Sequence, residues 1–269
     1  PTRVTFFGAE TARALREEGI QADLLLGNNV LAHVPRLHDF VEGLKLLLKP
    51  NGVITMEFPH LLQLMRETQF DTIYHEHFSY FSLLAVQQVF GAHGLRLFDV
   101  QSLETHGGSL RIFAAHESDL SRSVGPRVRA LEDEERRAGL EELGPYLTFG
   151  ERVKRTKRDL LPFLIDEKNE GKTVVGYGAP AKGNTLLNYC GAGSDLIDYT
   201  VDRSPHKQGK VLPGVRIRIE DPDRIRETRP DYVLILPWNI KDEVMAQMAY
   251  VREWGGQFVV PIPEVTVLR

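Results

Sequence analysis

The sequence predicts an α/β protein made of two Rossmann-like units joined by helices. Short apolar runs typical of buried strands alternate with helical patterns in both halves of the chain, and a highly charged helical stretch separates the halves. The length of 269 residues also suits two compact domains better than one. We therefore expect a first α/β unit over 1–117, connecting helices over 118–170 and a second α/β unit over 171–269.

Composition narrows the class of protein. Hydrophobic residues make up 42% and charged residues 26%, and the net charge of -4 gives no electrostatic case for a nucleic acid or an acidic membrane surface as partner. No run approaches the roughly 20 apolar residues that span a bilayer. The single cysteine, Cys190, excludes an internal disulfide and a thiolate zinc cluster. We expect a cytoplasmic protein with no membrane or nucleic-acid partner.

The first unit begins abruptly. The chain opens at Pro1 and runs directly into 4–7, which reads as a strand with nothing before it, so we interpret the start as a cut through a domain. A βαβ pattern follows: an apolar strand over 22–26, helical spacing over 37–48 and a second strand over 53–58.

The first unit is expected to end in a close pair of strands. A helix is predicted over 82–92, and strands over 95–101 and 109–115 are joined by a turn containing two glycines. This pattern predicts a doubly wound sheet with one reversed strand. The charged segment 118–170 then reads as a pair of connecting helices with solvated outer faces.

A second α/β unit starts after Gly171. Its first strand, 174–178, runs into a glycine turn. The remaining elements are predicted as helices over 180–189 and 240–254 and strands over 197–202, 231–237 and 257–262.

The densest run of chemically active residues is Tyr74-His75-Glu76-His77, which lies among aromatic residues past a strand end. Reactive groups gather beyond the carboxyl ends of strands in such sheets. Histidine is the natural general base near neutral pH, a carboxylate can orient it, and a tyrosine hydroxyl can stabilise an enolate oxygen. Two alternatives remain open: a metal site through His75, Glu76 and His77, which is disfavoured because adjacent residues point apart, and a polar loop that only packs.

A second candidate group follows the strand at 22–26. His33 lies in the run Gly27-Asn28-Asn29-Val30-Leu31-Ala32-His33, where this architecture meets a cofactor or substrate. Asn28 and Asn29 can offer amide groups to a ligand, or one of them can cap the next helix.

A glycine turn opens the second unit. The residues 176–181 fit G-x-G-x-x-A after a strand, and Asp202 ends the next strand, where a ribose acceptor of a dinucleotide would lie. Lys182, Lys207 and Lys210 add positive charge that suits a diphosphate. Read alone, this pattern indicates NAD binding.

Four motifs in order resemble the nucleotide-sugar (NDP-deoxyhexose) C-methyltransferases of deoxysugar biosynthesis. These motifs are Asn28-Asn29-Val30-Leu31-Ala32-His33-Val34-Pro35, then Ile73-Tyr74-His75-Glu76-His77-Phe78, then His106-Gly107-Gly108-Ser109-Leu110-Arg111, then Gly176-Tyr177-Gly178-Ala179-Pro180-Ala181-Lys182-Gly183. The closing Pro263-Glu264-Val265 also matches, so the resemblance covers nearly the whole chain.

The resemblance implies a class I S-adenosylmethionine-dependent enzyme in three parts: an N-terminal zinc-binding domain, a central methyl-donor domain and a C-terminal Rossmann-like domain. It implies that His77 is the general base, that Tyr74 contacts the ketone region of the sugar, and that Glu76 and His33 support the site. In the family's pattern the zinc domain and the donor domain's first strand and glycine loop precede Pro1. This chain is therefore expected to lack zinc and to carry part of the donor site.

The resemblance also assigns ligands. We expect the methyl donor, S-adenosyl-L-methionine, near Asn28, Asn29 and Val30, and no metal in this chain. The partner is expected to be a nucleotide-diphosphate keto-deoxysugar, with its contacts at His106, Gly107, Gly178, Lys182, Asp202 and Lys207. The glycine turn of the second unit then either holds the diphosphate end of the substrate or is a purely structural cap.

Three functions are compatible with these patterns. The first is C-methylation of a carbon alpha to a ketone on the nucleotide-linked deoxysugar, with His77 removing the proton. The second is a nicotinamide-dependent sugar oxidoreductase that uses the glycine turn. The third is a non-catalytic nucleotide-sugar binding module.

Overall fold

The computed structural model describes residues 2–269, which form two compact units. The first unit contains the residues up to Arg66 together with His75–Tyr146, and the second contains Glu67–Tyr74 together with Leu147–Arg269. The expected connecting segment 118–170 is thus divided between the two units, and a short piece from the first half of the chain, Glu67–Tyr74, belongs to the second unit.

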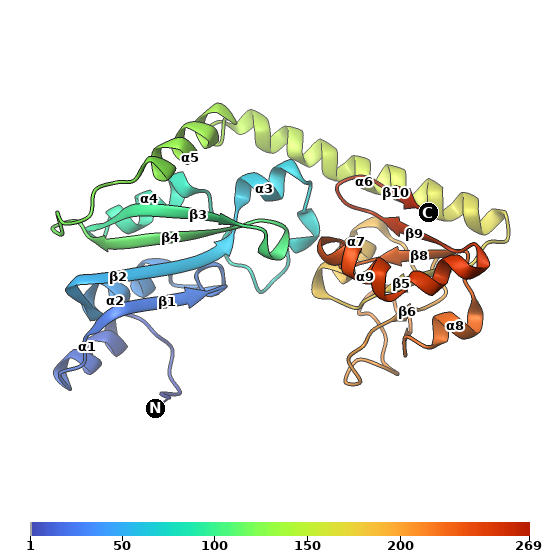
Figure 1. Cartoon of the computed structure of the whole chain (residues 1–269), viewed down its shortest axis with the longest axis horizontal. Helices are drawn as coiled ribbons and strands as arrows, with labels where there is room; N and C mark the ends of the chain where they lie inside the picture. The colour runs from blue at the N-terminus through green and yellow to red at the C-terminus, as the bar shows by residue number, and fades with distance from the viewer. Residues whose placement is uncertain (1) are drawn as a thin grey trace. The chain divides into compact units, whose positions relative to one another are not determined.

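The sheet of the first unit has four strands in the order β1-β2-β4-β3 (Figure 1). β1 (Ala22–Asn28) pairs parallel with β2 (Leu48–Pro59), and β4 (Ser109–His116) runs antiparallel to both β2 and β3 (Leu95–Leu103). The one reversed strand expected from the sequence is therefore confirmed, and it is β4.

The first unit also contains helices and short helical turns. They are α1 (Ala9–Glu17), η1 (Leu31–His33), α2 (Leu37–Leu47), α3 (Leu61–Arg66), α4 (Leu83–Gly91), η3 (Thr105–Gly107) and α5 (Pro126–Arg137). The side chains of α2 and α4 that share one helix face are buried against alternate residues of the strands. The fully buried core includes Val41, Ile54, Phe58, Leu83, Val86, Phe90, Leu110 and Ile112.

The expected strand at 4–7 is wrong. These residues form no ladder, and Val4 and Phe6 are almost fully exposed. Local contacts hold the segment against the following helices: the hydroxyl of Thr11 donates to the carbonyl of Phe6 at 2.8 Å, and the Phe7 ring packs edge-on against Phe40.

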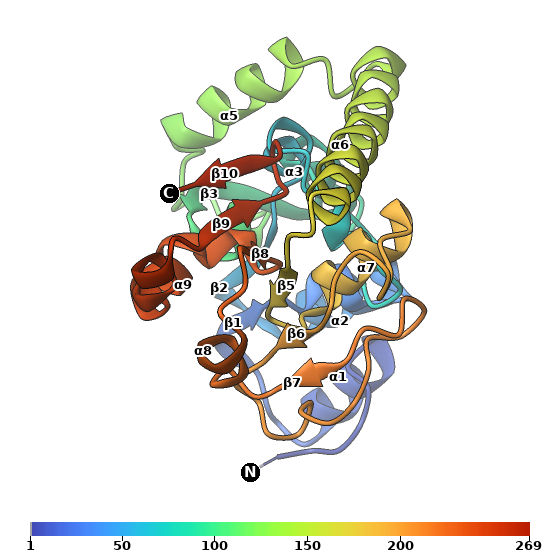
Figure 2. The ribbon, with the colours of Figure 1, turned by 90° about the vertical axis from the view of Figure 1, so that its right-hand side faces the viewer.

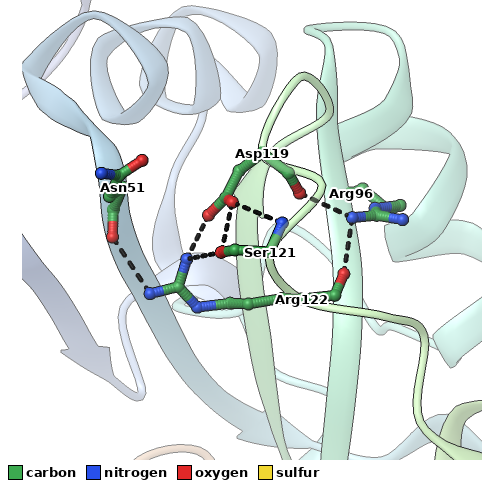
Figure 3. Close-up of polar contacts among 5 residues, drawn as sticks. All are labelled: Asn51, Arg96, Asp119, Ser121 and Arg122. Carbon is green, nitrogen blue, oxygen red and sulfur yellow. Dashed lines mark hydrogen bonds and ion pairs between the residues drawn. The ribbon is translucent and has the colours of Figure 1, made fainter.

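The loop after β4 is fixed by a polar network (Figure 3). The carboxylate of Asp119 accepts the backbone N–H of Ser121 at 3.0 Å and pairs with Arg122, which also donates to the carbonyl of Asn51 at 3.1 Å. Arg96 donates to the carbonyls of Asp119 and Arg122 at 2.9 and 2.7 Å. These bonds satisfy the loop's polar groups and join it to β2 and β3, so the start of α5 is held against this sheet.

The sheet of the second unit has six strands in the order β10-β9-β8-β5-β6-β7. The pairs between neighbours are parallel except for β10, which runs antiparallel to β9. The strands are β5 (Val174–Tyr177), β6 (Thr200–Val201), β7 (Ile219–Glu220), β8 (Tyr232–Ile235), β9 (Gln257–Val260) and β10 (Thr266–Leu268).

Helices cover both faces of this sheet. Figure 2 shows α6 (Leu143–Asn169) and α7 (Ala181–Cys190) on one side and α8 (Arg224–Thr228) and α9 (Lys241–Gln247) on the other. Three short turns, η2 (Phe70–Thr72), η4 (Trp238–Ile240) and η5 (Ala249–Trp254), complete the unit. The doubly wound α/β class expected for both halves is confirmed.

Two predicted elements differ in extent. The strand expected over 197–202 is shortened to Thr200–Val201, although the backbone N–H groups of Asp198 and Asp202 also donate to the Val174 and Glu220 carbonyls at 3.0 and 3.2 Å. The helix expected over 240–254 ends at Gln247 and resumes as the tighter turn η5. Among residues 2–269, no helix is both long enough and apolar enough to cross a bilayer.

Candidate active site

The first group of candidate residues lies at the carboxyl ends of β1 and β2. Asn28 is in register with Glu57, and the backbone N–H of Asn29 donates to the Glu57 carbonyl at 2.8 Å. Asn29 adopts a left-handed conformation with φ of 53°, which asparagine tolerates better than most residues. The chain is thereby turned out of the strand and into η1.

His33 and His77 meet at this edge of the sheet. The carbonyl of Ala32 accepts the backbone N–H groups of Phe78 and Ser79 at 2.8 and 3.3 Å, so the chain that follows His77 is attached to η1. The two imidazole rings consequently lie edge to face with their centroids 4.7 Å apart. The sequence predicted both histidines as site residues, and the structure brings them together.

Tyr80 completes the surroundings of His77 and was missed at the level of sequence. Its ring packs edge-on against His77 with centroids 5.7 Å apart and an interplanar angle of 82°. His33 and Tyr80 therefore both restrict the rotation of the His77 ring. The signal was its position three residues beyond His77 in an aromatic run.

A buried carboxylate, that of Glu57, binds two side chains near the end of β2. Glu57 is 5% exposed, and its two oxygens accept bonds from the Arg111 guanidinium at 2.8 Å and the Thr105 hydroxyl at 3.0 Å. Burial of a charge is tolerated where it is paired and hydrogen-bonded in this way. Glu57 was also missed, although a glutamate inside an otherwise apolar strand is an available signal.

The loop His106-Gly107-Gly108 joins this network. The Asn29 side-chain amide lies 3.0 Å from His106 Nε2, which brings together two residues expected to bind different ligands. All three loop residues have positive φ, and a Cβ on Gly108 would lie 3.0 Å from the side chain of Gln63. Gly108 is therefore required both by its backbone conformation and by the close approach of α3.

A cavity of about 470 Å³ adjoins His33 in the first unit. Its lining is mainly apolar and aromatic, with one carboxylate: Phe6, Phe7, Val30, His33, Val34, Pro35, Phe40 and Asp39 are among its residues. Such a lining fits a flat heteroaromatic ring system with few polar groups. Of the three residues expected at the donor, Val30 lines this cavity, whereas Asn28 and Asn29 do not.

The remaining residues of the Tyr74–His77 motif are placed differently. His75 and Glu76 are exposed, and neither has a hydrogen-bond or ion-pair partner within residues 2–269. Tyr74 is half-buried and ends the segment that belongs to the second unit. Over the same residues, no group of three or more His, Cys, Asp or Glu side chains has the arrangement of a metal site.

The glycine turn of the second unit is occupied by a carboxylate of the same chain. Asp202 Oδ2 accepts the backbone N–H of Ala179 at 2.8 Å and the ammonium of Lys207 at 3.1 Å, and Oδ1 accepts the Ser204 N–H at 2.9 Å. Burial acts to raise the pKa of Asp202, but the bonds from Ser204, Ala179 and Lys207 outweigh it and lower that pKa. Two residues predicted to bind a ligand, Asp202 and Lys207, are thus engaged with each other and with the turn.

Lys182 lies in the first turn of α7 and faces η4 and η2. Its ammonium is 4.3 Å from the centroid of the Trp238 ring and donates to Asn239 Oδ1 at 2.7 Å. The Trp238 indole N–H donates to Asp71 Oδ2 at 2.7 Å. Burial lowers the pKa of Lys182, while the charge of Asp71 opposes that shift.

The comparisons with known sequences define the class of protein. Residues 4–100 match the family model of a methyltransferase domain, and residues 104–263 match the model described as the C-methyltransferase C-terminal domain. The chain therefore belongs to the C-methyltransferase family. Across 262 residues, 97% of this chain, it is 40% identical to the C-methyltransferase NovU of Streptomyces niveus, and it spans 62% of that relative's length.

Solved structures give only distant likenesses. A putative methyltransferase in complex with the Trm112 activator of Haloferax volcanii is similar with a TM-score of 0.31 and 13% identity, covering 36% of this chain and 54% of that one. An O-methyltransferase family protein from Burkholderia thailandensis gives 0.31 and 15% identity, covering 44% and 36%.

Proposed function

We propose that the protein transfers a methyl group from S-adenosylmethionine to a carbon alpha to a ketone on a nucleotide-linked deoxysugar. The observation that carries the proposal is the contact of His33 with His77 at the strand ends of a chain in the C-methyltransferase family. The reaction is ordered by acidity: the C–H next to the ketone must lose its proton before the carbon becomes a nucleophile.

His77 is proposed as the base that removes this proton. Its ring is held between His33 and Tyr80, so one ring orientation is favoured before the substrate arrives. A fixed base loses less entropy in the transition state, and general-base catalysis contributes about 10²- to 10⁴-fold to a rate. Tyr74 is proposed to donate a hydrogen bond to the enolate oxygen, and Glu76 is proposed to stabilise the protonated imidazole.

The methyl donor is proposed to lie along the cavity beside His33. When bound, its sulfonium supplies an electrophilic methyl carbon. Val30, Phe7 and Phe40 would bury its apolar parts and exclude water, and Asp39 would accept hydrogen bonds from its polar groups. Asn28 and Asn29 are proposed to hold the edge of this site through the turn after β1.

The sugar end of the substrate is proposed to contact the loop of His106 and Gly107. Asn29 orients the His106 imidazole. Glu57, which is paired with Arg111, supports the same loop by accepting the Thr105 hydroxyl. The bonds of Asp202 with Lys207 and Ala179, of Lys182 with Asn239, and of the Gly178 carbonyl with the Thr200 hydroxyl favour the structural role of these residues over a role as diphosphate ligands. This geometry also argues against the nicotinamide-dependent alternative, because the Ala179 N–H already has an acceptor.

The proposal is tested by methyl transfer from labelled S-adenosylmethionine to a nucleotide-diphosphate 4-keto-deoxysugar. His77→Ala is expected to lower kcat by about 10²- to 10⁴-fold with little change in the KM of the sugar nucleotide. His75→Ala, in the same motif but exposed and without a hydrogen-bond or ion-pair partner in the described part of the chain, is the matched control and is expected to retain near-normal turnover. Near-normal turnover by His77→Ala would remove the base assignment.

Binding measurements separate the two other functions. Calorimetry with the sugar nucleotide, S-adenosylmethionine and NADH is expected to show binding of the first two. Tight binding of NADH with no binding of S-adenosylmethionine would favour the oxidoreductase. Binding of nucleotide alone, without methyl transfer, would favour the non-catalytic module.

A further inference from the structure

The second unit has the crevice in which a doubly wound sheet ordinarily binds a ligand. In the order β10-β9-β8-β5-β6-β7, the chain leaves β5 toward β6 and β7 and then returns to the other side of β5 at β8. The carboxyl ends of β5 and β8 therefore flank the switch point of the topology, where ligands of such sheets bind. Lys182 follows β5, and Trp238 and Asn239 follow β8.

A segment of the same chain occupies this position. Asp71 in η2 is 0% exposed, and its Oδ2 accepts the Trp238 indole N–H at 2.7 Å. The Lys182 ammonium lies over the Trp238 ring, 4.3 Å from its centroid, and its positive charge acts to lower the pKa of Asp71. The adjacent Phe70 is 5% exposed, belongs to the core of the second unit and packs edge-on against Tyr189 of α7.

Asp71 is a buried carboxyl group held in a ligand site. Its Oδ1 is buried without a hydrogen-bond partner, although the backbone N–H groups of Asp71 and Thr72 lie near enough to favour the charge. Burial raises the pKa of Asp71 to about 7, against the opposing effects of the Trp238 bond, the Lys182 charge and these N–H groups. Lys182 is the charged group that faces Asp71 from α7, and Trp238 faces it from η4.

The neighbouring glycine turn is closed in the same manner by Asp202, which accepts the Ala179 N–H and the Lys207 ammonium. The donors that an external phosphate would use at Ala179, Lys207 and Trp238 are thus each engaged by a carboxylate of the chain. One carboxylate, Asp71, lies in η2, and the other, Asp202, directly follows β6.

We propose that the ligand crevice of the second unit is a socket for the segment Glu67–Tyr74, with the Asp71 carboxyl group as its buried anchor, and that this socket positions Tyr74, the last residue of the segment. Asp71 is a positioning residue: it contacts no reacting atom and acts on Tyr74 through the two residues between them, Thr72 and Ile73. The positioning part rests on the proposed function, whereas the socket itself does not.

The socket is tested by amide hydrogen exchange over residues 67–77. Asp71→Ala is expected to accelerate exchange there by about 10- to 100-fold, because the buried Trp238 indole N–H is left without its acceptor, while peptides of β1 and β2 are unchanged. Sodium formate, which can fill the vacated anion position, is expected to slow exchange again. Asp242→Ala, an exposed aspartate of α9, is the matched control and is expected to exchange as the wild type does.

Wild-type exchange in Asp71→Ala would overturn the socket, and so would NADH binding that accelerates exchange over 67–77. If Asp71→Ala does not fold, the same exchange measurement is made on Trp238→Phe, which removes the N–H donor and keeps an aromatic ring. Faster exchange over 67–77 in that variant is expected, and unchanged exchange would overturn the socket.

Turnover tests the positioning role separately. Asp71→Ala is expected to lower kcat by about 100-fold with little change in KM for S-adenosylmethionine, and formate is expected to restore part of it. Faster exchange with unchanged kcat would overturn the positioning role. Absence of methyl transfer in the wild type, with the expected exchange pattern, would instead contradict the proposed function and leave the socket standing.

Discussion

Glu135 shows how single residues fix the first unit. It lies on α5, is 0% exposed, and accepts bonds from the backbone N–H groups of Leu83 and Leu84 at 2.7 and 2.9 Å and from His60 Nε2 at 2.8 Å. The carboxylate thus caps the N-terminus of α4, where a negative charge is favoured by the helix dipole. His60 directly follows β2, and its backbone N–H donates to the Gly108 carbonyl, so the residue held by Glu135 also supports the site loop.

Removing this carboxylate is expected to be costly. Glu135→Ala leaves three donors without an acceptor and should lower the free energy of unfolding of the first unit by about 3–5 kcal/mol. Glu134→Ala on the same helix removes only an exposed pair with Arg66 and should change it by less than about 1 kcal/mol. Urea titration followed by far-ultraviolet circular dichroism measures both; equal costs would show that the cap does not contribute.

Asp202 gives a pH-dependent prediction. Its pKa in the folded protein is lowered despite burial, so folding favours the ionised form. The advantage of the wild type over Asp202→Asn, about 1–3 kcal/mol, is therefore expected to be complete above the unfolded pKa of about 3.9 and to disappear as the pH falls through the lower folded value. Thermal unfolding of both proteins between pH 2.5 and 7 measures this difference, and a constant gap across the range would contradict it.

At the scale of elements, most helices and strands followed from apolar spacing. The pattern predicted α2, α4 and the hairpin of β3 and β4 because their buried faces repeat with the period of the structure they form. Which residues meet in the site was harder to predict. His33 and His77 are brought together because the Ala32 carbonyl accepts the backbone N–H groups of Phe78 and Ser79, and no local sequence pattern encodes that contact. Glu57 and Tyr80 were missed although each had a local signal, because a glutamate in an apolar strand and a tyrosine in an aromatic run do not by themselves show which residues they contact.

The packing of α7 on β8 depends on a glycine. A Cβ on Gly183 would lie 2.7 Å from Leu236 Cβ, so Gly183→Ala should lower the free energy of unfolding by about 1–3 kcal/mol through overpacking. Gly150 in α6 has open space at the same position, and Gly150→Ala should raise stability by about 0.4–1 kcal/mol. Denaturant unfolding compares the two; a stabilising Gly183→Ala would contradict the close approach.

At the scale of the whole molecule, the second unit is discontinuous in sequence. Composition and periodicity suggested contiguous units, because Phe70 and Asp71 read as part of the histidine motif that follows them. Their burial against α7 and η4 is a long-range contact that single-sequence patterns do not encode. The grouping of Glu67–Tyr74 with residues beyond 147 was accordingly not predicted.

The first sheet has an exposed apolar edge. β1 is one of its two outer strands, and Leu24 and Leu26 on β1 are 55% and 65% exposed. Such an edge pairs readily with other chains, so this 269-residue chain is expected to self-associate with rising concentration. Sedimentation velocity should show less association for Leu26→Lys than for the wild type. Leu147→Lys, at a similarly exposed leucine of α6, is the control and should associate as the wild type does. Equal association of all three proteins would show that β1 is not the associating surface.

The central claim is that the His77 imidazole takes a proton from the carbon beside the ketone. It is tested most directly by incubating the protein in D₂O with a nucleotide-diphosphate 4-keto-deoxysugar and S-adenosylhomocysteine, so that no methyl transfer occurs, and following the alpha proton by NMR. We expect the wild type to wash that proton out and His77→Asn to slow the exchange by about 10²- to 10⁴-fold while still binding the nucleotide. Exchange at the wild-type rate in His77→Asn would contradict the account.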